Sequence, residues 1–109
     1  MSISGYKIVW LQVSFDLPVK TEIQRRKASK FRNFLLDDGF EMAQYSLYMR
    51  FCRSGEAAEK HIRRISANAP DTGKVHVLSI TDKQYEKIIT IHAAHEKISR
   101  EKPPNFSSY

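Results

Sequence analysis

The sequence predicts a single α+β domain in which two helices cover one face of a mainly antiparallel sheet. Three observations support this prediction. Apolar residues switch between alternating and helical spacing in the order β-α-β(β)-α-β-β, the length of 109 residues suits one domain, and 41% of the residues are hydrophobic. A chain with this much apolar material can bury a core, which excludes intrinsic disorder.

The first half of the chain begins with a strand and a helix. Residues 7–15 alternate, with one parity entirely apolar over Val9, Leu11, Val13 and Phe15. Thr21 and Gln24 then have the spacing of a capping box. They predict a helix over residues 21–38 that stops before Gly39.

The second half repeats this alternation of patterns. Residues 40–52 alternate over a length that predicts either one bent strand or two short ones. Ser54 can cap a second helix that ends before Pro70. Two segments rich in β-branched residues, 74–81 and 84–92, then predict two strands joined by a short turn.

The ends of the chain and its composition predict a cytoplasmic protein without a membrane partner. The domain is expected to cover residues 1–95, and residues 96–109 to form a basic, flexible tail. The apolar run at residues 8–11 is too short to span a membrane. Cys52 is the single cysteine, so neither an intrachain disulfide nor a cysteine-based zinc site is expected.

One face of the predicted sheet remains without a cover. If the helices cover the odd parity of the first strand, the other face presents Ile8 and Trp10, followed by polar residues as far as Asp16. Burying Ile8 and Trp10 against a second copy would contribute roughly 2 to 3 kcal/mol each. We therefore expect a sheet-to-sheet homodimer, with Asp16 facing its symmetry mate near the twofold axis.

The formal net charge of +6 arises mainly in the two predicted helices. Their basic side chains point away from the apolar stripes, and the candidates for nucleic-acid binding are Arg25, Arg26, Lys30, Arg32, Lys60 and Arg64. Two outward basic helices on one side of a sheet, repeated in a dimer, suit the phosphate backbone of a duplex. Duplex DNA is the expected partner, with RNA as the alternative.

Several segments follow one another in the order seen in a known family: Phe15-Asp16-Leu17-Pro18, then residues 30–36, 39–40, 44–48, 57–62 and 80–86. Over about residues 6–92 the chain resembles the smaller of the two universal CRISPR adaptation proteins, a family of metal-dependent endoribonucleases. The resemblance implies a ferredoxin-like βαββαβ sandwich plus a C-terminal strand that commonly crosses to the partner protomer of a homodimer. It also implies a magnesium site at the strand-end aspartate and an integrase partner that inserts new spacer DNA. Phe15 departs from the family, which usually has Tyr before the aspartate.

Asp16 is the candidate catalytic residue and Mg²⁺ ligand. Mg²⁺ takes one or two carboxylates and completes its shell with water and substrate phosphate, so one aspartate per chain, doubled in a dimer, meets the minimum. The first strand holds no second acidic residue before Asp16, and no histidine is recognisably placed as a base. His92 and His95 have helical spacing but lack a third ligand for zinc.

Three function classes stay open. The favoured one is a binding and scaffolding subunit that supports duplex DNA and the integrase. The second is a metal-dependent endonuclease acting through paired Asp16, and the third is a stand-alone metal-dependent ribonuclease of the toxin type, which shares this fold. An RNA-recognition module is disfavoured because no strand carries a Gly-aromatic-Gly signature.

Overall fold

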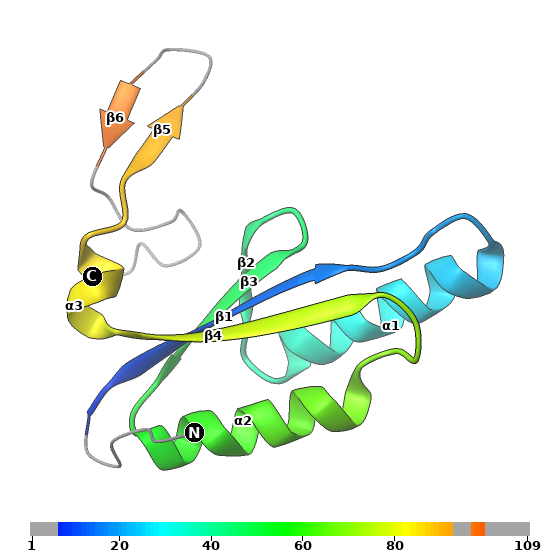
Figure 1. Ribbon diagram of the computed structural model, residues 1–109, viewed down its shortest axis with the longest axis horizontal. Helices are drawn as coiled ribbons and strands as arrows, with labels where there is room; N and C mark the ends of the chain where they lie inside the picture. Colours follow the sequence, from blue (N-terminus) through cyan, green and yellow to red (C-terminus); the bar gives the residue numbers. More distant parts are fainter. Residues whose placement is uncertain (1–6, 93–96, 100–109) are drawn as a thin grey trace.

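The computed structural model describes residues 7–92 and 97–99. A four-stranded antiparallel sheet has the strand order β2-β3-β1-β4, and two long helices lie on one of its faces (Figure 1). The strands are β1 (Val9–Asp16), β2 (Glu41–Gln44), β3 (Leu47–Cys52) and β4 (Lys74–Thr81), and the helices are α1 (Glu22–Asp37) and α2 (Gly55–Asn68). This order confirms the α+β, ferredoxin-like βαββαβ fold.

The helix-facing parity of β1 forms the main core. The apolar side chains of β1 pack against side chains from α1, β3 and α2. The β1 residues are Val9, Leu11, Val13 and Phe15, and their partners include Phe31 and Leu35 of α1, Cys52 of β3, and Ala58 and Ile65 of α2. Desolvation by burial raises the pKa of the Cys52 thiol, although the nearby Arg50 guanidinium acts in the opposite direction. Cys52 is therefore a buried core residue with a neutral thiol, and a neutral thiol is a poor nucleophile.

The capping box predicted for the first helix is present. The Thr21 hydroxyl accepts a hydrogen bond from the Gln24 backbone N–H at 3.1 Å, and the Gln24 side-chain oxygen accepts one from the Thr21 N–H at 3.0 Å. The alternating segment over 40–52 resolves into two strands, β2 and β3, joined by a tight turn. Ser46 in this turn has φ 62°, in the left-handed region that non-glycine residues rarely adopt.

The strand predicted over residues 84–92 is wrong for its first half. The segment begins instead with a short helix, α3 (Asp82–Glu86). It returns to strand only in β5 (Thr90–His92), which pairs with β6 (Lys97–Ser99) and projects away from the main sheet (Figure 1).

A second capping box explains the short helix. The Thr81 hydroxyl accepts a hydrogen bond from the Gln84 N–H at 3.1 Å, and the Gln84 side-chain oxygen accepts one from the Thr81 N–H at 2.8 Å. The backbone N–H groups of Thr81 and Gln84, which have no partner within the helix, are thus both hydrogen-bonded. This capping favours a helix here despite the β-branched residues that follow. The Thr-x-x-Gln spacing, identical to that at Thr21, is the sequence signal for this helix.

Helix α3 covers Trp10, so the prediction that a second copy buries this side chain is wrong. Trp10 is only 4% exposed. The Tyr85 ring stacks on the Trp10 ring with the two centroids 3.7 Å apart. The indole N–H of Trp10 donates a hydrogen bond to the Asp82 carboxylate at 2.9 Å. Ile8, Phe51 and Leu78 stay exposed on this face, so they are available for a second copy to cover.

The predicted C-terminal tail falls mostly outside the described residues. Of residues 96–109 the structure describes 97–99, which form β6. Within the described ranges, no helix combines the length and apolar character needed to cross a membrane.

Candidate functional site

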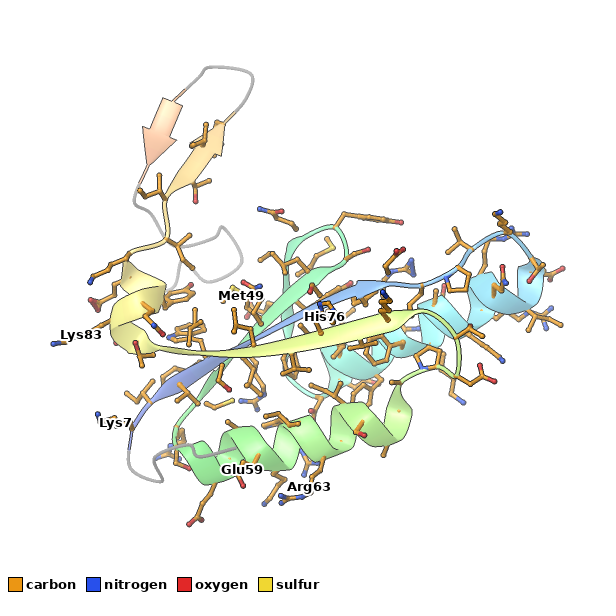
Figure 2. All side chains as sticks on the ribbon, viewed as in Figure 1. Lys7, Met49, Glu59, Arg63, His76 and Lys83 are labelled. Atoms are coloured by element: carbon orange, nitrogen blue, oxygen red, sulfur yellow. The ribbon has the colours of Figure 1, made fainter. Side chains whose placement is uncertain are left out.

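Asp16 is the last residue of β1 and its side chain is exposed. Antiparallel pairing sets Asp16 opposite Lys74 of β4 and sets Ser14 opposite His76, the histidine labelled in Figure 2. Directly paired residues project to the same side of an antiparallel sheet, so these side chains share the face that α1 and α2 leave open. Within the described part of the chain, no residue donates a hydrogen bond to the Asp16 carboxylate.

Lys74 and His76 are the site residues that sequence reasoning misses. Their nearness to Asp16 arises from the β1–β4 register, which local patterns do not reveal. His76 is the diagonal neighbour of Asp16, about 7–8 Å away between Cα atoms, which is a separation that long side chains can span. Among the described residues no hydrogen bond joins the two side chains. The face around Asp16 is therefore mixed in charge rather than purely acidic.

Two backbone contacts position the end of β1. The Phe15 N–H donates to the Ser46 carbonyl at 3.2 Å, which attaches the strand to the β2–β3 turn. On the other side Gly73, with φ +85°, lies so close that a Cβ built on it would be 2.6 Å from the Asp16 carbonyl oxygen. The strand end is thus held between the β2–β3 turn and the turn before β4.

Gly73→Ala is expected to destabilise the protein by about 1–3 kcal/mol and to lower any activity that depends on Asp16, because it adds both backbone strain and a clash. Urea unfolding and cleavage assays measure the two effects. Gly39→Ala is the matched control, since Gly39 has φ +88° but its added Cβ would meet the flexible Arg50 side chain instead of Asp16. Wild-type stability for Gly73→Ala would contradict the close approach.

A cavity of about 220 Å³ opens beside Asp16. It is lined by the end of β1, by α1 and by the β2–β3 turn, with Phe15, Asp16, Leu17, Val19, Ala28, Arg32, Tyr45 and Ser46 as lining residues. The Arg32 guanidinium lies 5.8 Å from the centroid of the Tyr45 ring, within the range of a cation–π contact. Asp16 and Arg32, predicted for separate roles, therefore meet at one cavity.

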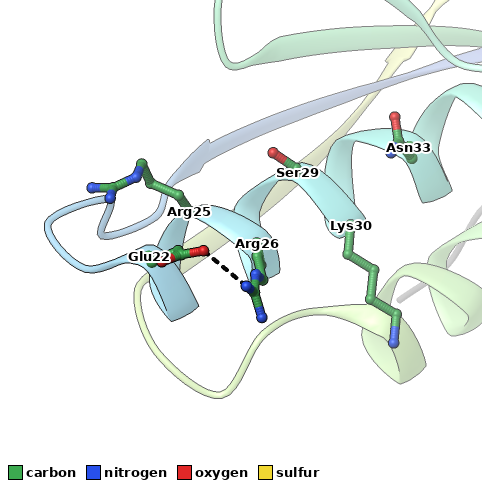
Figure 3. A pocket seen from close by; sticks show the side chains of 6 residues that line it. All are labelled: Glu22, Arg25, Arg26, Ser29, Lys30 and Asn33. Atoms are coloured by element: carbon green, nitrogen blue, oxygen red, sulfur yellow. Dashed lines mark hydrogen bonds and ion pairs between the residues drawn. The ribbon is translucent and has the colours of Figure 1, made fainter.

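The outer face of α1 is basic, as predicted, but two of its arginines already have partners. Arg26 pairs with Glu22 at 2.8 Å, and Arg25 donates to the carbonyls of Val19 and Lys20 at 3.0 and 3.1 Å. Lys30 makes no ion pair or hydrogen bond with any described residue. Figure 3 shows these side chains along an open groove of about 420 Å³. Lys30 is thus available to a ligand without the loss of an internal interaction.

Of the two nucleic-acid-binding residues predicted on α2, Arg64 already has a partner within the protein and Lys60 does not. Arg64 donates to one oxygen of Asp38 at 3.0 Å, and the other oxygen lies 2.6 Å from His61 Nδ1. The Asp38 and His61 side chains are each only 9% exposed, so this cluster attaches α2 to the end of α1. Lys60 is exposed and, among the described residues, has no partner. Figure 2 shows Glu59 and Arg63 on the edge of α2 that points away from the sheet.

Comparison with known proteins identifies the family. The family described as "CRISPR associated protein Cas2" matches residues 9–88, which is most of the chain. The chain belongs to the Cas2 family. The resemblance predicted from the ordered sequence segments is therefore confirmed.

Three curated Cas2 relatives are each named "CRISPR-associated endoribonuclease Cas2". The one from Paracidovorax avenae is 41% identical over 107 residues, which cover 98% of this chain and 99% of the relative. The one from Flavobacterium psychrophilum is 51% identical over 83 residues, covering 76% of this chain and 72% of the relative. The one from Acidovorax ebreus is 48% identical over 73 residues, covering 67% and 72%.

The donor set of this Cas2 chain limits the metal site that the family resemblance implies. In the described ranges, no three His, Cys, Asp or Glu side chains gather closely enough to hold a metal ion. Asp16 therefore belongs to no cluster of three such donors among those residues, and its own carboxylate meets the lower limit for Mg²⁺. Such a set suits an ion whose remaining ligands are water and substrate phosphate, and it would be strengthened by a second Asp16 across a dimer axis.

Proposed function

We propose that this chain is the DNA-binding and scaffolding subunit of CRISPR spacer acquisition. As a homodimer it holds duplex DNA along α1 and α2 and supports insertion of that DNA by an integrase partner. The observation that carries this proposal is the open basic groove on α1, where Lys30 is free of internal partners next to Arg25 and Arg26. An open, polar groove on a helix suits a phosphate backbone better than it suits a small enclosed ligand.

The homodimer would use the open sheet face. Leu78 on β4 is 52% exposed there, and Ile8 just before β1 is 41% exposed. Strand β4 lies at the edge of the sheet, so its outer backbone groups can accept another strand. Strand β5 projects away from the four-stranded sheet of its own chain, which fits the strand crossing that the family resemblance implies.

Phosphodiester cleavage at Asp16 is the second candidate function. It is favoured by the exposed side chain of Asp16, a residue that lines a cavity, and by the endoribonuclease name of the relatives. Bound Mg²⁺ would supply charge stabilisation at the phosphate and a more acidic water. The chain itself contributes the Asp16 carboxylate as a ligand and Lys74, on the paired strand, as a positive charge for the phosphate. A stand-alone ribonuclease of the toxin type would use the same residues on RNA without an integrase.

Replacing the candidate lysine of each helix, Lys30→Glu with Lys60→Glu, is expected to weaken duplex DNA binding at least tenfold at low salt, alike for all DNA sequences. Each phosphate that is no longer neutralised lowers the magnitude of the slope of log affinity against log salt by about 0.9, so this magnitude should fall by about 2 for each protomer that contacts the DNA. Fluorescence anisotropy over a salt series measures both quantities.

A matched control for this test is Lys83→Glu with Lys87→Glu. It changes the net charge by the same amount at α3, where Figure 2 labels Lys83 far from α1. Equal losses for the two double variants, or an affinity that does not depend on salt, would contradict backbone contact at the helices.

A further inference from the structure

We propose that the cavity beside Asp16 binds one unpaired nucleobase of a single strand, by stacking on Tyr45. This inference rests on the proposed cleavage at Asp16 and names the residue that would hold a base of the substrate beside this site. It concerns a surface separate from the α1 groove that is proposed to hold duplex DNA.

Tyr45 provides the stacking surface. Its side chain is 81% exposed although it is large and aromatic, and it lies in the turn between β2 and β3. Aromatic side chains stack on unpaired bases because every base has a π-face, and this contact tolerates any sequence. The position of Tyr45 is tied to the site through backbone, since the next residue, Ser46, accepts the hydrogen bond of Phe15, which precedes Asp16.

Arg32 supplies the positive charge next to this ring. It reaches over from α1 to within 5.8 Å of the Tyr45 ring centroid and makes no ion pair with any described acidic residue. A guanidinium in this position can stack on a base and donate to a phosphate or to a base carbonyl. Arg32 thus differs from the α1 arginines that lie in the outer groove.

The cavity has the size and lining for one base. At about 220 Å³ it is smaller than the roughly 300–1,000 Å³ of pockets for drug-sized ligands, so its size favours a single base over a base pair. Leu17, Val19 and Ala28 give it an apolar wall, whereas Asp16, Arg32 and Ser46 give it a polar rim. The apolar side chains suit the flat face of a base. The phosphate next to that base in the strand would then lie near Asp16, where Arg32 can donate to it.

The test compares Tyr45→Ala, Tyr45→Phe and wild type in binding short single strands of RNA and of DNA with the same sequence. Each strand carries one 2-aminopurine, whose fluorescence is quenched when the base stacks. We expect Tyr45→Ala to lose about 5- to 150-fold in affinity together with the quenching, because base–aromatic stacking contributes that much per base. Tyr45→Phe, which keeps the ring, should stay close to wild type, and duplex DNA binding should be unchanged in both variants.

The outcomes separate this inference from the proposed function. A loss with either kind of strand supports the base site and shows which sugar it accepts. Wild-type affinity and quenching for Tyr45→Ala with both strands would overturn it. Cleavage abolished in Asp16→Asn, with single-strand binding retained, would support the proposed cleavage independently. Because Tyr45 is exposed, the Ala variant is expected to keep its melting temperature, which circular dichroism can verify.

Discussion

Asp16→Asn is expected to lower metal-dependent cleavage by orders of magnitude while the fold stays unchanged. Asparagine keeps the volume of the side chain and one oxygen, but it removes the negative charge that a hard Mg²⁺ ion requires. The Asp16 side chain is exposed, and no described residue donates a hydrogen bond to it, so little stability depends on its charge.

The informative measurement for Asp16→Asn is paired: cleavage and reconstituted DNA integration, each with wild type beside the variant. A scaffold predicts integration near the normal rate, because Lys30 and Lys60 are untouched. Loss of cleavage and integration together, with the dimer and the integrase complex intact, would contradict the scaffold proposal. Sedimentation serves as the control for assembly, and a 12.7 kDa monomer at micromolar concentration would contradict the proposed homodimer.

Tyr85→Ala is expected to reduce the free energy of unfolding by about 3–5 kcal/mol, the usual cost of truncating a buried aromatic side chain. Tyr85 is 1% exposed and stacks on Trp10 with the ring planes only 5° apart. A helix of five residues such as α3 has little stability of its own, so truncating this ring removes the main attachment of α3 to the sheet. Urea unfolding measures the change as a shift of the midpoint at constant slope.

Trp10 also provides a direct optical readout for this variant. It is the only tryptophan, and its burial depends on α3, so Tyr85→Ala should shift its emission to longer wavelength. Tyr45→Ala is the matched control, because it makes the same change at an exposed tyrosine and should alter stability by no more than about 0.5 kcal/mol. Unchanged stability and emission in Tyr85→Ala would mean that α3 does not cover the sheet.

The sequence was enough to single out several residues of the candidate site, but not to show which of them lie next to one another. Asp16 stands out in sequence as a carboxylate at the end of a strand on the uncovered parity, and helical geometry correctly turns the basic residues outward. Helical geometry does not reveal which side chains of other elements lie within hydrogen-bond distance. The pairing of Arg64 in α2 with Asp38 at the end of α1 was therefore found only in the structure. The cavity of Asp16, Arg32 and Tyr45 likewise joins three segments that are distant in the chain.

Local sequence patterns were enough to predict most of the order of strands and helices, the start of α1 and the helix-facing core. Hydrophobic period and capping are local, so neighbouring residues suffice to specify them. Tertiary packing was needed to learn which side chains meet across the β1–β4 register, and whether Trp10 is covered by α3 or by a second copy. Those outcomes depend on contacts between residues far apart in the chain, such as Trp10 with Tyr85, and such contacts form only when the register and the packing of whole elements bring the two side chains together.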